Sequence, residues 1–364
     1  MKNIRLVFLL VALVLVACAP TPPQQDIPLA TPSVRLVASE TPAPSPSATA
    51  IQLPSATPTI PPSPTPTPHP VSIAFLRAGS YLGSDIVIEK ELARGGNYRR
   101  YYASYLSEGY KIYALLTIPD GEVPEGGFPA IVFNHGYIPP EVYRTTERYI
   151  AYVDRLALAG YVVFRIDYRG HDQSEGPASG AYGDPGYAID VLNALASIKR
   201  LPQVNPARIG MWGHSMGGYL TLRAMVVSHE IKAGVIWAGV VGSYPDMIYN
   251  WRRSGSFTPS PSSRGAGWRS SWLETYGTPQ ENPAFWASLS ANNYLADLSG
   301  PIQLHHGTED EDVPVSFSVG LDEQIRAAGG QSELYLYEKD NHNISHYFSL
   351  AMQRTIDFFD EHLK

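Results

Sequence analysis

A regular alternation of short apolar runs and helical segments begins near Phe128 and continues to the C-terminus. Apolar runs such as FPAIVFN, YVVFRI and ARIGMWG predict strands buried on both faces, because they lack the alternation of apolar and polar residues typical of a half-exposed strand. Between them lie segments with helical spacing, such as TERYIAYVDRLALAG. Strands that alternate with helices in this way predict an α/β fold, with a mostly parallel central sheet and helices on both faces.

Two parts of the chain depart from this alternation. Before Phe128, the aromatic-rich runs SDIVIEKEL and NYRRYYASYLSEGYKIYALLTIP, with a turn at Gly109, predict antiparallel strands at one edge of the sheet. Residues 242–297 lie between two predicted strands, and their four tryptophans indicate a packed surface: Trp251, Trp268, Trp272 and Trp286. We interpret this stretch as a small lid insertion, because long connections in compact domains are usually functional or disordered.

The first 18 residues have the pattern of an export signal. Lys2 and Arg5 precede the apolar run Leu6–Ala17, which is shorter than the roughly 20 residues that a membrane-spanning helix needs. The following LVAC resembles the lipobox of bacterial lipoproteins, in which the cysteine is lipidated and becomes the new N-terminus. This resemblance implies a lipoprotein signal peptide, a cell-envelope protein anchored at Cys18 and an extracytoplasmic domain. An ordinary signal peptide with a chance cysteine is the alternative.

Residues 19–70 differ in composition from the rest of the chain. They hold half of its 32 prolines, separated mainly by Ser, Thr and Ala. Such a segment cannot bury enough apolar surface to fold, so we predict a disordered, extended linker. Residues 71–364 are then long enough for one α/β domain.

Composition excludes several classes of function. The formal net charge is −7 and no stretch is rich in Lys or Arg, so nucleic acid is not an expected partner. Cys18 is the only cysteine, which excludes disulfides, cysteine nucleophiles and cysteine-ligated metals from the predicted domain. The membrane is expected as a partner only through a lipid on Cys18.

The stretch GMWGHSMGGYL carries the candidate nucleophile. Gly213, Ser215 and Gly217 form the G-x-S-x-G pattern, between a predicted strand and a predicted helix. In this motif the serine occupies a strained turn at the end of a strand, and side chains two residues away on either side would collide with backbone. We therefore predict that Ser215 is a nucleophile exposed at the carboxyl edge of the sheet.

A serine nucleophile needs a base and an acid that orients the base. On this type of fold they follow in the order serine, acid, histidine. Candidate acids follow the predicted strand PIQLHHG: Glu309, Asp310, Glu311 and Asp312. Candidate bases follow the last predicted strand: His342 and His346.

The domain resembles the catalytic domain of the prolyl oligopeptidase family within the α/β-hydrolases. The matching stretches are FNHGY, DYRGHDQSEG, VNPARIGMWGHSMGG, ENPAFWASLSANNYLADLSGPIQLHHGTEDEDVP and YEKDNHN, which cover nearly the whole domain. The resemblance implies an α/β-hydrolase fold, with Asp310 as the acid and His342 as the base. We expect Asp312 to cap the following helix, His346 to belong to the closing helix, and His305 and His306 to be structural.

An oxyanion hole needs two hydrogen-bond donors. One is expected from the backbone N–H of Met216, the residue after the nucleophile. The other is expected from Tyr137, at the start of the loop after FPAIVFNHG. The resemblance allows either the hydroxyl or the backbone N–H of Tyr137 to donate. In DYRGHDQSEG, Asp172 occupies a position that is usually glycine, and it is expected to adopt a positive φ angle.

Together these residues predict a serine hydrolase that forms an acyl-enzyme without a metal or an organic cofactor. The resemblance favours a serine peptidase acting on peptides, and a carboxylesterase acting on small esters is the alternative. Familiar members carry an N-terminal β-propeller that filters substrates, whereas a Pro-rich segment stands in that place here, so proline specificity is not implied. A non-catalytic binding protein is the hypothesis from a different class. A metal site at His342 and His346 lacks an evident third ligand.

Overall fold

A computed structural model describes residues 67–251 and 267–364. The predicted signal peptide with Cys18, the linker up to residue 66 and residues 252–266 of the predicted lid lie outside the described residues. Within the described part, no helix combines the length and the apolar character needed to cross a membrane.

A single sheet forms the centre of the domain, in the strand order β1-β2-β3-β5-β4-β6-β7-β8-β9. The pairings β1–β2, β2–β3 and β3–β5 are antiparallel, and all later neighbours pair in parallel. This arrangement confirms the predicted α/β-hydrolase fold with antiparallel strands at one edge. The described strands are β1 (Val87–Leu92), β2 (Tyr98–Ser107), β3 (Tyr110–Pro119), β4 (Phe128–Asn134), β5 (Val162–Ile166), β6 (Val204–His214), β7 (Ala233–Trp237), β8 (Ile302–Gly307) and β9 (Ser332–Tyr337).

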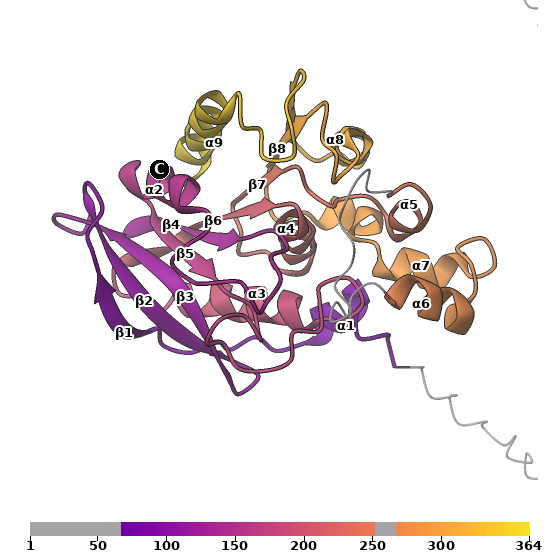
Figure 1. Cartoon of the computed structure of the whole chain (residues 1–364), viewed down its shortest axis with the longest axis horizontal. Coiled ribbons are helices and arrows are strands. Elements are labelled where there is room, and N and C mark those ends of the chain that lie inside the picture. Colours follow the sequence, from indigo (N-terminus) through magenta and orange to yellow (C-terminus); the bar gives the residue numbers. More distant parts are fainter. Residues whose placement is uncertain (1–66, 252–266) are drawn as a thin grey trace, which may run out of the picture. The chain divides into compact units, whose positions relative to one another are not determined.

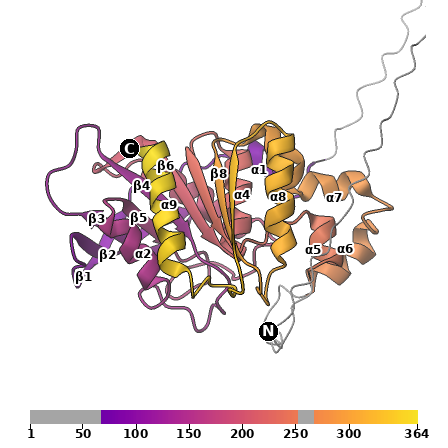
Figure 2. The same ribbon diagram turned by 90° about the horizontal axis from the view of Figure 1, so that it is seen from above.

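Helices cover both faces of this sheet, as predicted. The side chains of α2 and α9 pack in one hydrophobic cluster, and those of α1, α3, α4 and α8 pack in another. Figures 1 and 2 show these two groups of helices on opposite sides of the sheet. Strands β4 to β7 are buried along most of their length because they are covered from both sides. The helices in question are α1 (Ile73–Ala78), α2 (Ile150–Leu158), α3 (Gly186–Ile198), α4 (Met216–Val227), α8 (Val315–Ala327) and α9 (Phe348–Leu363).

The segment predicted as a lid insertion contains short helices. They are α5 (Tyr244–Tyr249), α6 (Trp268–Tyr276), α7 (Pro283–Leu289) and the 3₁₀ helix η1 (Ala291–Asp297). Figure 2 shows α5, α6 and α7 side by side, at the end of the domain opposite β1. Their tryptophans are buried against one another, with the Trp268 and Trp272 rings 5.3 Å apart between centroids. The tryptophans therefore build the core of this insertion.

His69 was assigned to the linker from its sequence, yet it packs against the insertion. Its ring lies edge-on to those of Trp272, Tyr276 and Phe285, at 5.0, 5.4 and 5.5 Å between centroids. Burial lowers the pKa of His69, which favours the neutral ring in this aromatic setting. Ordered packing thus begins inside the segment whose proline content predicted disorder.

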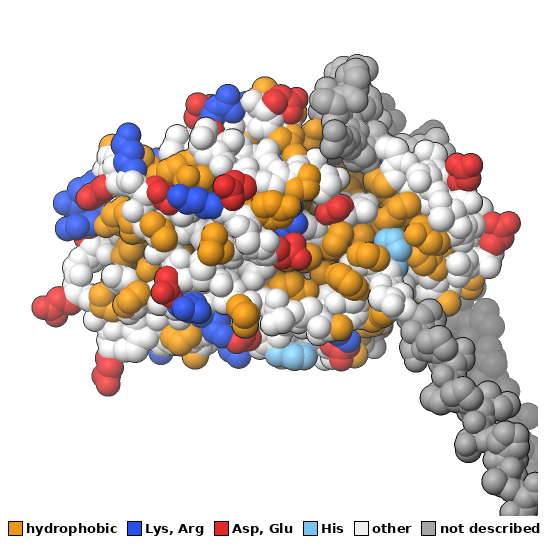
Figure 3. Space-filling model, turned by 90° about the horizontal axis from the view of Figure 1, so that it is seen from below, with side chains coloured by type: hydrophobic (Ala, Val, Ile, Leu, Met, Phe, Trp, Pro, Cys, Tyr) orange, Lys and Arg blue, Asp and Glu red, His pale blue; other side chains and the backbone are white. Residues whose placement is uncertain are grey.

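Charges of both signs share the surface of the domain. In the face shown in Figure 3, Lys and Arg side chains lie among Asp and Glu side chains. Several form ion pairs, such as Arg94 with Asp120 and Lys111 with Glu89. Exposed pairs of this kind contribute little to stability.

Candidate active site

Ser215 occupies the sharp turn that joins β6 to α4. Its φ and ψ angles are 55° and −117°, a strained combination for a residue other than glycine. A Cβ atom at Gly213 would lie 2.2 Å from the Gly217 carbonyl oxygen, and one at Gly217 would lie 1.9 Å from that of Asn134. Both glycines of the motif are therefore required sterically, as the sequence predicted, and the turn places Ser215 at the carboxyl end of β6.

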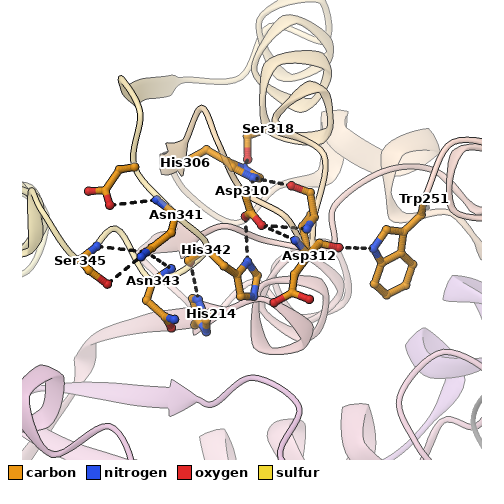
Figure 4. Close-up of polar contacts among 12 residues, drawn as sticks. His214, Trp251, His306, Asp310, Asp312, Ser318, Asn341, His342, Asn343 and Ser345 are labelled. Atoms are coloured by element: carbon orange, nitrogen blue, oxygen red, sulfur yellow. Dashed lines mark hydrogen bonds and ion pairs between the residues drawn. The ribbon is translucent and has the colours of Figure 1, made fainter. Parts of the chain in front are cut away.

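Asp310 and His342 meet beside this turn, although they are 32 residues apart. Asp310 follows β8 and His342 follows β9. The Nδ1 atom of His342 donates a hydrogen bond of 2.8 Å to Oδ2 of Asp310, which fixes the orientation of the imidazole (Figure 4). The structure places Asp310 rather than Asp312 against this histidine.

The side chain of Asp310 is completely buried and accepts hydrogen bonds from further donors. His306 Nε2 lies 3.0 Å from Oδ2 of Asp310, and the backbone N–H groups of Asp312 and Val313 donate to Oδ1 at 2.8 and 2.9 Å. Burial by itself would raise the pKa of Asp310, but the hydrogen bonds from His306 and His342 outweigh it and hold this pKa well below its usual range. The carboxylate is therefore negatively charged at neutral pH.

His306 is a site residue that sequence reasoning treated only as a structural end of a strand. Its ring is fully buried, and its Nδ1 atom lies 2.7 Å from the Ser318 hydroxyl of α8. It thereby ties the Asp310 loop to the helix that follows. The two histidines four and five residues before Asp310 were the signal available, but the sequence does not reveal which of them turns toward the carboxylate.

Two predictions about neighbouring residues are wrong. Asp312 does not cap the next helix: the N-cap of α8 is Pro314, and the backbone N–H of Asp312 is already bonded to Asp310. His346 does not belong to the closing helix, since α9 begins at Phe348. The backbone N–H of His346 instead donates to the Asp340 carboxylate, which organises the turn before the helix.

A pocket of about 320 Å³ opens at these residues. Its lining comprises Gly136, Tyr137, Ile138, Arg148, Tyr149, Tyr152, His214, Ser215, Asp312, His342 and Asn343. Ser215 and His342 line it together, and among the described residues no hydrogen bond joins their side chains. Such bonds are often long without substrate and tighten in the reacting complex. The volume is at the lower end of the range for small-molecule sites.

His214, adjacent to the serine, connects the two sides of this pocket. Tyr149 accepts the Gly136 N–H at 2.9 Å and lies 2.7 Å from Nδ1 of His214, while Nε2 of His214 lies 3.0 Å from the His342 carbonyl oxygen. Since that carbonyl can only accept, Nε2 carries the proton and Tyr149 donates to Nδ1. Burial lowers the pKa of His214 to about 3, so the ring is neutral. Tyr149 gave no signal in the sequence.

The two residues predicted to supply the oxyanion donors both lie near Ser215. Met216 is the first residue of α4, so its N–H has no partner within the helix. Tyr137 lines the same pocket as Ser215 and belongs to the segment that follows β4. Asp172 adopts a φ of 49°, which confirms the predicted positive angle.

A second buried carboxylate lies behind the same region. Asp167, just after β5, accepts hydrogen bonds from the hydroxyls of Tyr143 and Thr145. Burial raises the pKa of Asp167 to about 7. None of these three residues lines the pocket.

No group of three or more His, Cys, Asp or Glu side chains is arranged to hold a metal ion within residues 67–251 and 267–364. In particular, His342 bonds to Asp310 and the side chain of His346 pairs with Asp340. The two histidines of the predicted alternative therefore serve different carboxylates.

Comparisons with known proteins agree with this geometry. The sequence pattern of the prolyl oligopeptidase family matches residues 148–364. The uncharacterized peptidase YtmA of Bacillus subtilis is 26% identical over 259 residues, which cover 71% of this chain and 90% of that protein. Other curated relatives are longer: the chain spans 34% of the uncharacterized peptidase YuxL of the same organism.

Solved structures resemble the described fold as well. The acylaminoacyl peptidase of Pyrococcus horikoshii is 26% identical with a TM-score of 0.58, over 74% of this chain and 42% of that one. An acetyl xylan esterase from Paenibacillus sp. R4 has a TM-score of 0.59 at 19% identity, over 81% of this chain and 96% of that one. The esterase likeness, at this identity, concerns the fold alone.

Proposed function

Since the chain belongs to the prolyl oligopeptidase family and is a serine hydrolase, we propose that it cleaves peptide bonds through Ser215, His342 and Asp310. The observation that carries the proposal is the 2.8 Å bond between His342 and Asp310 at the pocket that contains Ser215. A nucleophile, a base and an orienting acid then follow in the chain order of the fold.

In the proposed reaction, Nε2 of His342 takes the Ser215 proton as the hydroxyl oxygen attacks the carbonyl carbon of the substrate. The imidazolium that forms is stabilised by the Asp310 carboxylate and then donates the proton to the leaving amine. Water next attacks the acyl-enzyme, with His342 again acting as the base. Asp310 remains charged throughout, which its lowered pKa supports.

The negative oxygen of the tetrahedral intermediate would be held by the Met216 N–H and by Tyr137, through its hydroxyl or its backbone N–H. Two preorganised donors of this kind stabilise charge that develops only in the transition state. The position of Met216 at the N-terminus of α4 supports the proposal, because the helix dipole favours negative charge there.

Labelling with a fluorophosphonate probe tests the nucleophile. We expect the protein to be labelled on Ser215 and the Ser215→Ala variant to remain unlabelled. Equal labelling of both proteins would show that the reactive serine is elsewhere. Parallel assays with p-nitrophenyl acetate and with aminoacyl p-nitroanilides separate ester from amide substrates, and activity toward esters alone would favour the carboxylesterase.

We also propose that the protein is a lipoprotein of the cell envelope, anchored through Cys18 and carrying its catalytic domain on the Pro-rich linker outside the cytoplasm. The basic residues, short apolar run and LVAC of the N-terminus support this proposal. Expression in a bacterial host should leave the protein in the membrane fraction and the Cys18→Ala variant outside it. If the variant stays in the membrane fraction, another part of the chain binds the membrane.

A further inference from the structure

Two side chains of opposite charge line the pocket beside Ser215, and neither has a partner among the described residues. Arg148 and Asp312 both contribute to its walls. In the part of the chain that the structure describes, neither the Arg148 guanidinium nor the Asp312 carboxylate makes a hydrogen bond or an ion pair. Asp310, two residues away, is by contrast fully buried and bonded to two imidazoles. The unpaired charges are therefore available to a ligand.

The fold places these two charges on opposite sides of the nucleophile. Ser215 follows β6, whose neighbours in the sheet are β4 on one side and β7, then β8, on the other. Arg148 belongs to the segment between β4 and α2, and Asp312 belongs to the loop after β8. A substrate that presents a bond to Ser215 consequently has one part directed toward Arg148 and another toward Asp312.

The backbone at Asp312 is held in place while its carboxylate is not. Its N–H donates to Asp310 Oδ1 at 2.8 Å, and its carbonyl accepts a bond of 2.7 Å from the Trp251 indole. Figure 4 shows the side chain of Asp312 directed to the same side as the His342 imidazole. A cationic group in the pocket would thus meet an unpaired carboxylate carried on a backbone that is already held in place.

Arg148 is similarly placed next to an anchored residue. Its neighbour Tyr149 bonds to the Gly136 N–H and to His214, which fixes the backbone where the arginine begins. The guanidinium itself is exposed at the pocket wall. Arginine binds carboxylates through two parallel hydrogen bonds, so this is the group that a substrate carboxylate requires.

We propose that the pocket selects short zwitterionic peptides, with a free amino group bound by Asp312 and a carboxylate bound by Arg148. The volume of about 320 Å³ limits the occupant to a short segment. Charge-assisted bonds are roughly twice as strong as neutral ones, so both ends contribute to selection. The inference rests on the proposed function, because it takes Ser215 as the group that attacks between the two ends.

Calorimetry with the full chain carrying Ser215→Ala measures binding without turnover. The probes are four forms of trialanine: free at both ends, N-acetylated, C-amidated, and capped at both ends. The free peptide should bind about tenfold more tightly than either singly capped form, as expected for the loss of one charged hydrogen bond. Equal dissociation constants for the four peptides would overturn the proposal.

Charge-removing variants assign each end of the peptide. Asp312→Asn should weaken binding of peptides with a free amino group about tenfold and leave the N-acetylated peptides unchanged. Arg148→Gln should do the same for the carboxylate and spare the amidated peptides. A variant that weakens all four peptides equally would show a structural role and contradict the assignment.

Matched controls remove the same charges outside the pocket. Glu309→Gln alters an exposed carboxylate in the Asp310 loop, and Arg155→Gln alters a guanidinium in α2. Neither residue lines the pocket, so all four dissociation constants should stay as in the parent. If the control variants weaken binding as much as Asp312→Asn and Arg148→Gln do, the effect comes from the overall electrostatic field of the domain. That result would overturn the proposed subsite.

Failure of this inference is distinguishable from failure of the proposed function. Fluorophosphonate labelling of Ser215 with four equal peptide affinities would keep the serine hydrolase and remove the zwitterion subsite. An unlabelled protein that still discriminates the four peptides would keep the subsite and remove Ser215 as the nucleophile.

Discussion

Two buried carboxylates lie close to the carboxyl edge of the sheet, and their charge states differ. Asp310 and Asp167 both have fully buried side chains. Asp310 accepts hydrogen bonds from two histidines, and its pKa is held well below the usual range despite burial. Asp167 accepts its side-chain hydrogen bonds from the hydroxyls of Tyr143 and Thr145, and burial raises its pKa to about 7.

The difference shows that burial alone does not decide whether a carboxylate is charged. Imidazole donors become positively charged on protonation and stabilise a neighbouring anion strongly, whereas hydroxyl donors remain neutral. Asp310 is thus suited to support an imidazolium on His342, which faces the pocket. Asp167 instead joins the segment after β4 to the end of β5, and its partners do not line the pocket.

The largest expected effect separates the two carboxylates by activity. Asp310→Asn should lower kcat by about 10⁴-fold, because an amide favours the wrong tautomer of His342 and cannot stabilise its cation. Asp167→Asn should change kcat by no more than a few-fold. Hydrolysis of p-nitrophenyl acetate measures both variants, and similar losses in the two would remove the functional distinction between these residues.

The next effect is on stability as a function of pH, with opposite signs for the two residues. The folded pKa of Asp167 lies above the unfolded value of about 3.9, so its stabilising contribution is complete below that value and is lost as the pH rises toward about 7. Asp310 has a lowered folded pKa, so its contribution is present above about 3.9 and is lost as the pH falls.

Thermal unfolding between about pH 2 and pH 8 tests this difference. Asp167→Asn should remove a decline in stability toward neutral pH, of up to about 1.4 kcal/mol per pH unit for one proton. Asp310→Asn should retain that decline and lose instead the stabilisation that is complete above about pH 4 and disappears as the pH falls below it. Parallel pH profiles for the two variants and the parent would contradict the assigned protonation states.

The smallest expected effect concerns the contact that links the Gly136 side of the pocket to His342. Tyr149→Phe removes the hydroxyl between the Gly136 N–H and His214, and leaving buried groups unpaired costs about 1–3 kcal/mol. We expect kcat to fall about tenfold with KM nearly unchanged, since Tyr149 would act by positioning His342 through His214.

Tyr98→Phe is the matched control for that variant. It removes a hydroxyl bonded to Asp154 of α2 at 2.6 Å, away from the pocket lining. Its kcat should equal that of the parent. An equal loss of kcat in both variants would show that general loosening of α2, rather than the Tyr149 hydroxyl, accounts for the effect.

Much of the fold was predictable because it depends on local patterns. Apolar runs of strand length that alternate with helical segments predict a mostly parallel sheet, whatever the order of the strands within it. The structure confirms this sheet. The turn at Ser215 was predictable for a similar reason, since Gly213 and Gly217 are required by contacts within a few ångströms of Ser215. Asp172 adopts the expected positive φ because that angle belongs to one residue and its immediate turn.

Contacts between distant parts of the chain were not predictable in the same way. Tyr149 and His214 are 65 residues apart, and His69 meets Trp272 across most of the domain. Nothing in the sequence near Tyr149 marks it as a partner of His214. Composition also did not predict the ordered position of His69. Proline content predicts disorder for the whole segment, whereas the packing of His69 depends on aromatic side chains that lie far away in the sequence.

By itself, the sequence determined the order of strands and helices, the serine at the end of β6 and the short sets of acids and histidines that follow in chain order. Periodicity and steric limits act over a few residues, so they can be recognised in the sequence alone. Only the tertiary structure decided that His306 supports Asp310, that Asp312 turns its carboxylate to the pocket, and that Arg148 stands on the other side of Ser215. These positions depend on how loops from different strands come together at one edge of the sheet, and no local sequence pattern predicts that arrangement.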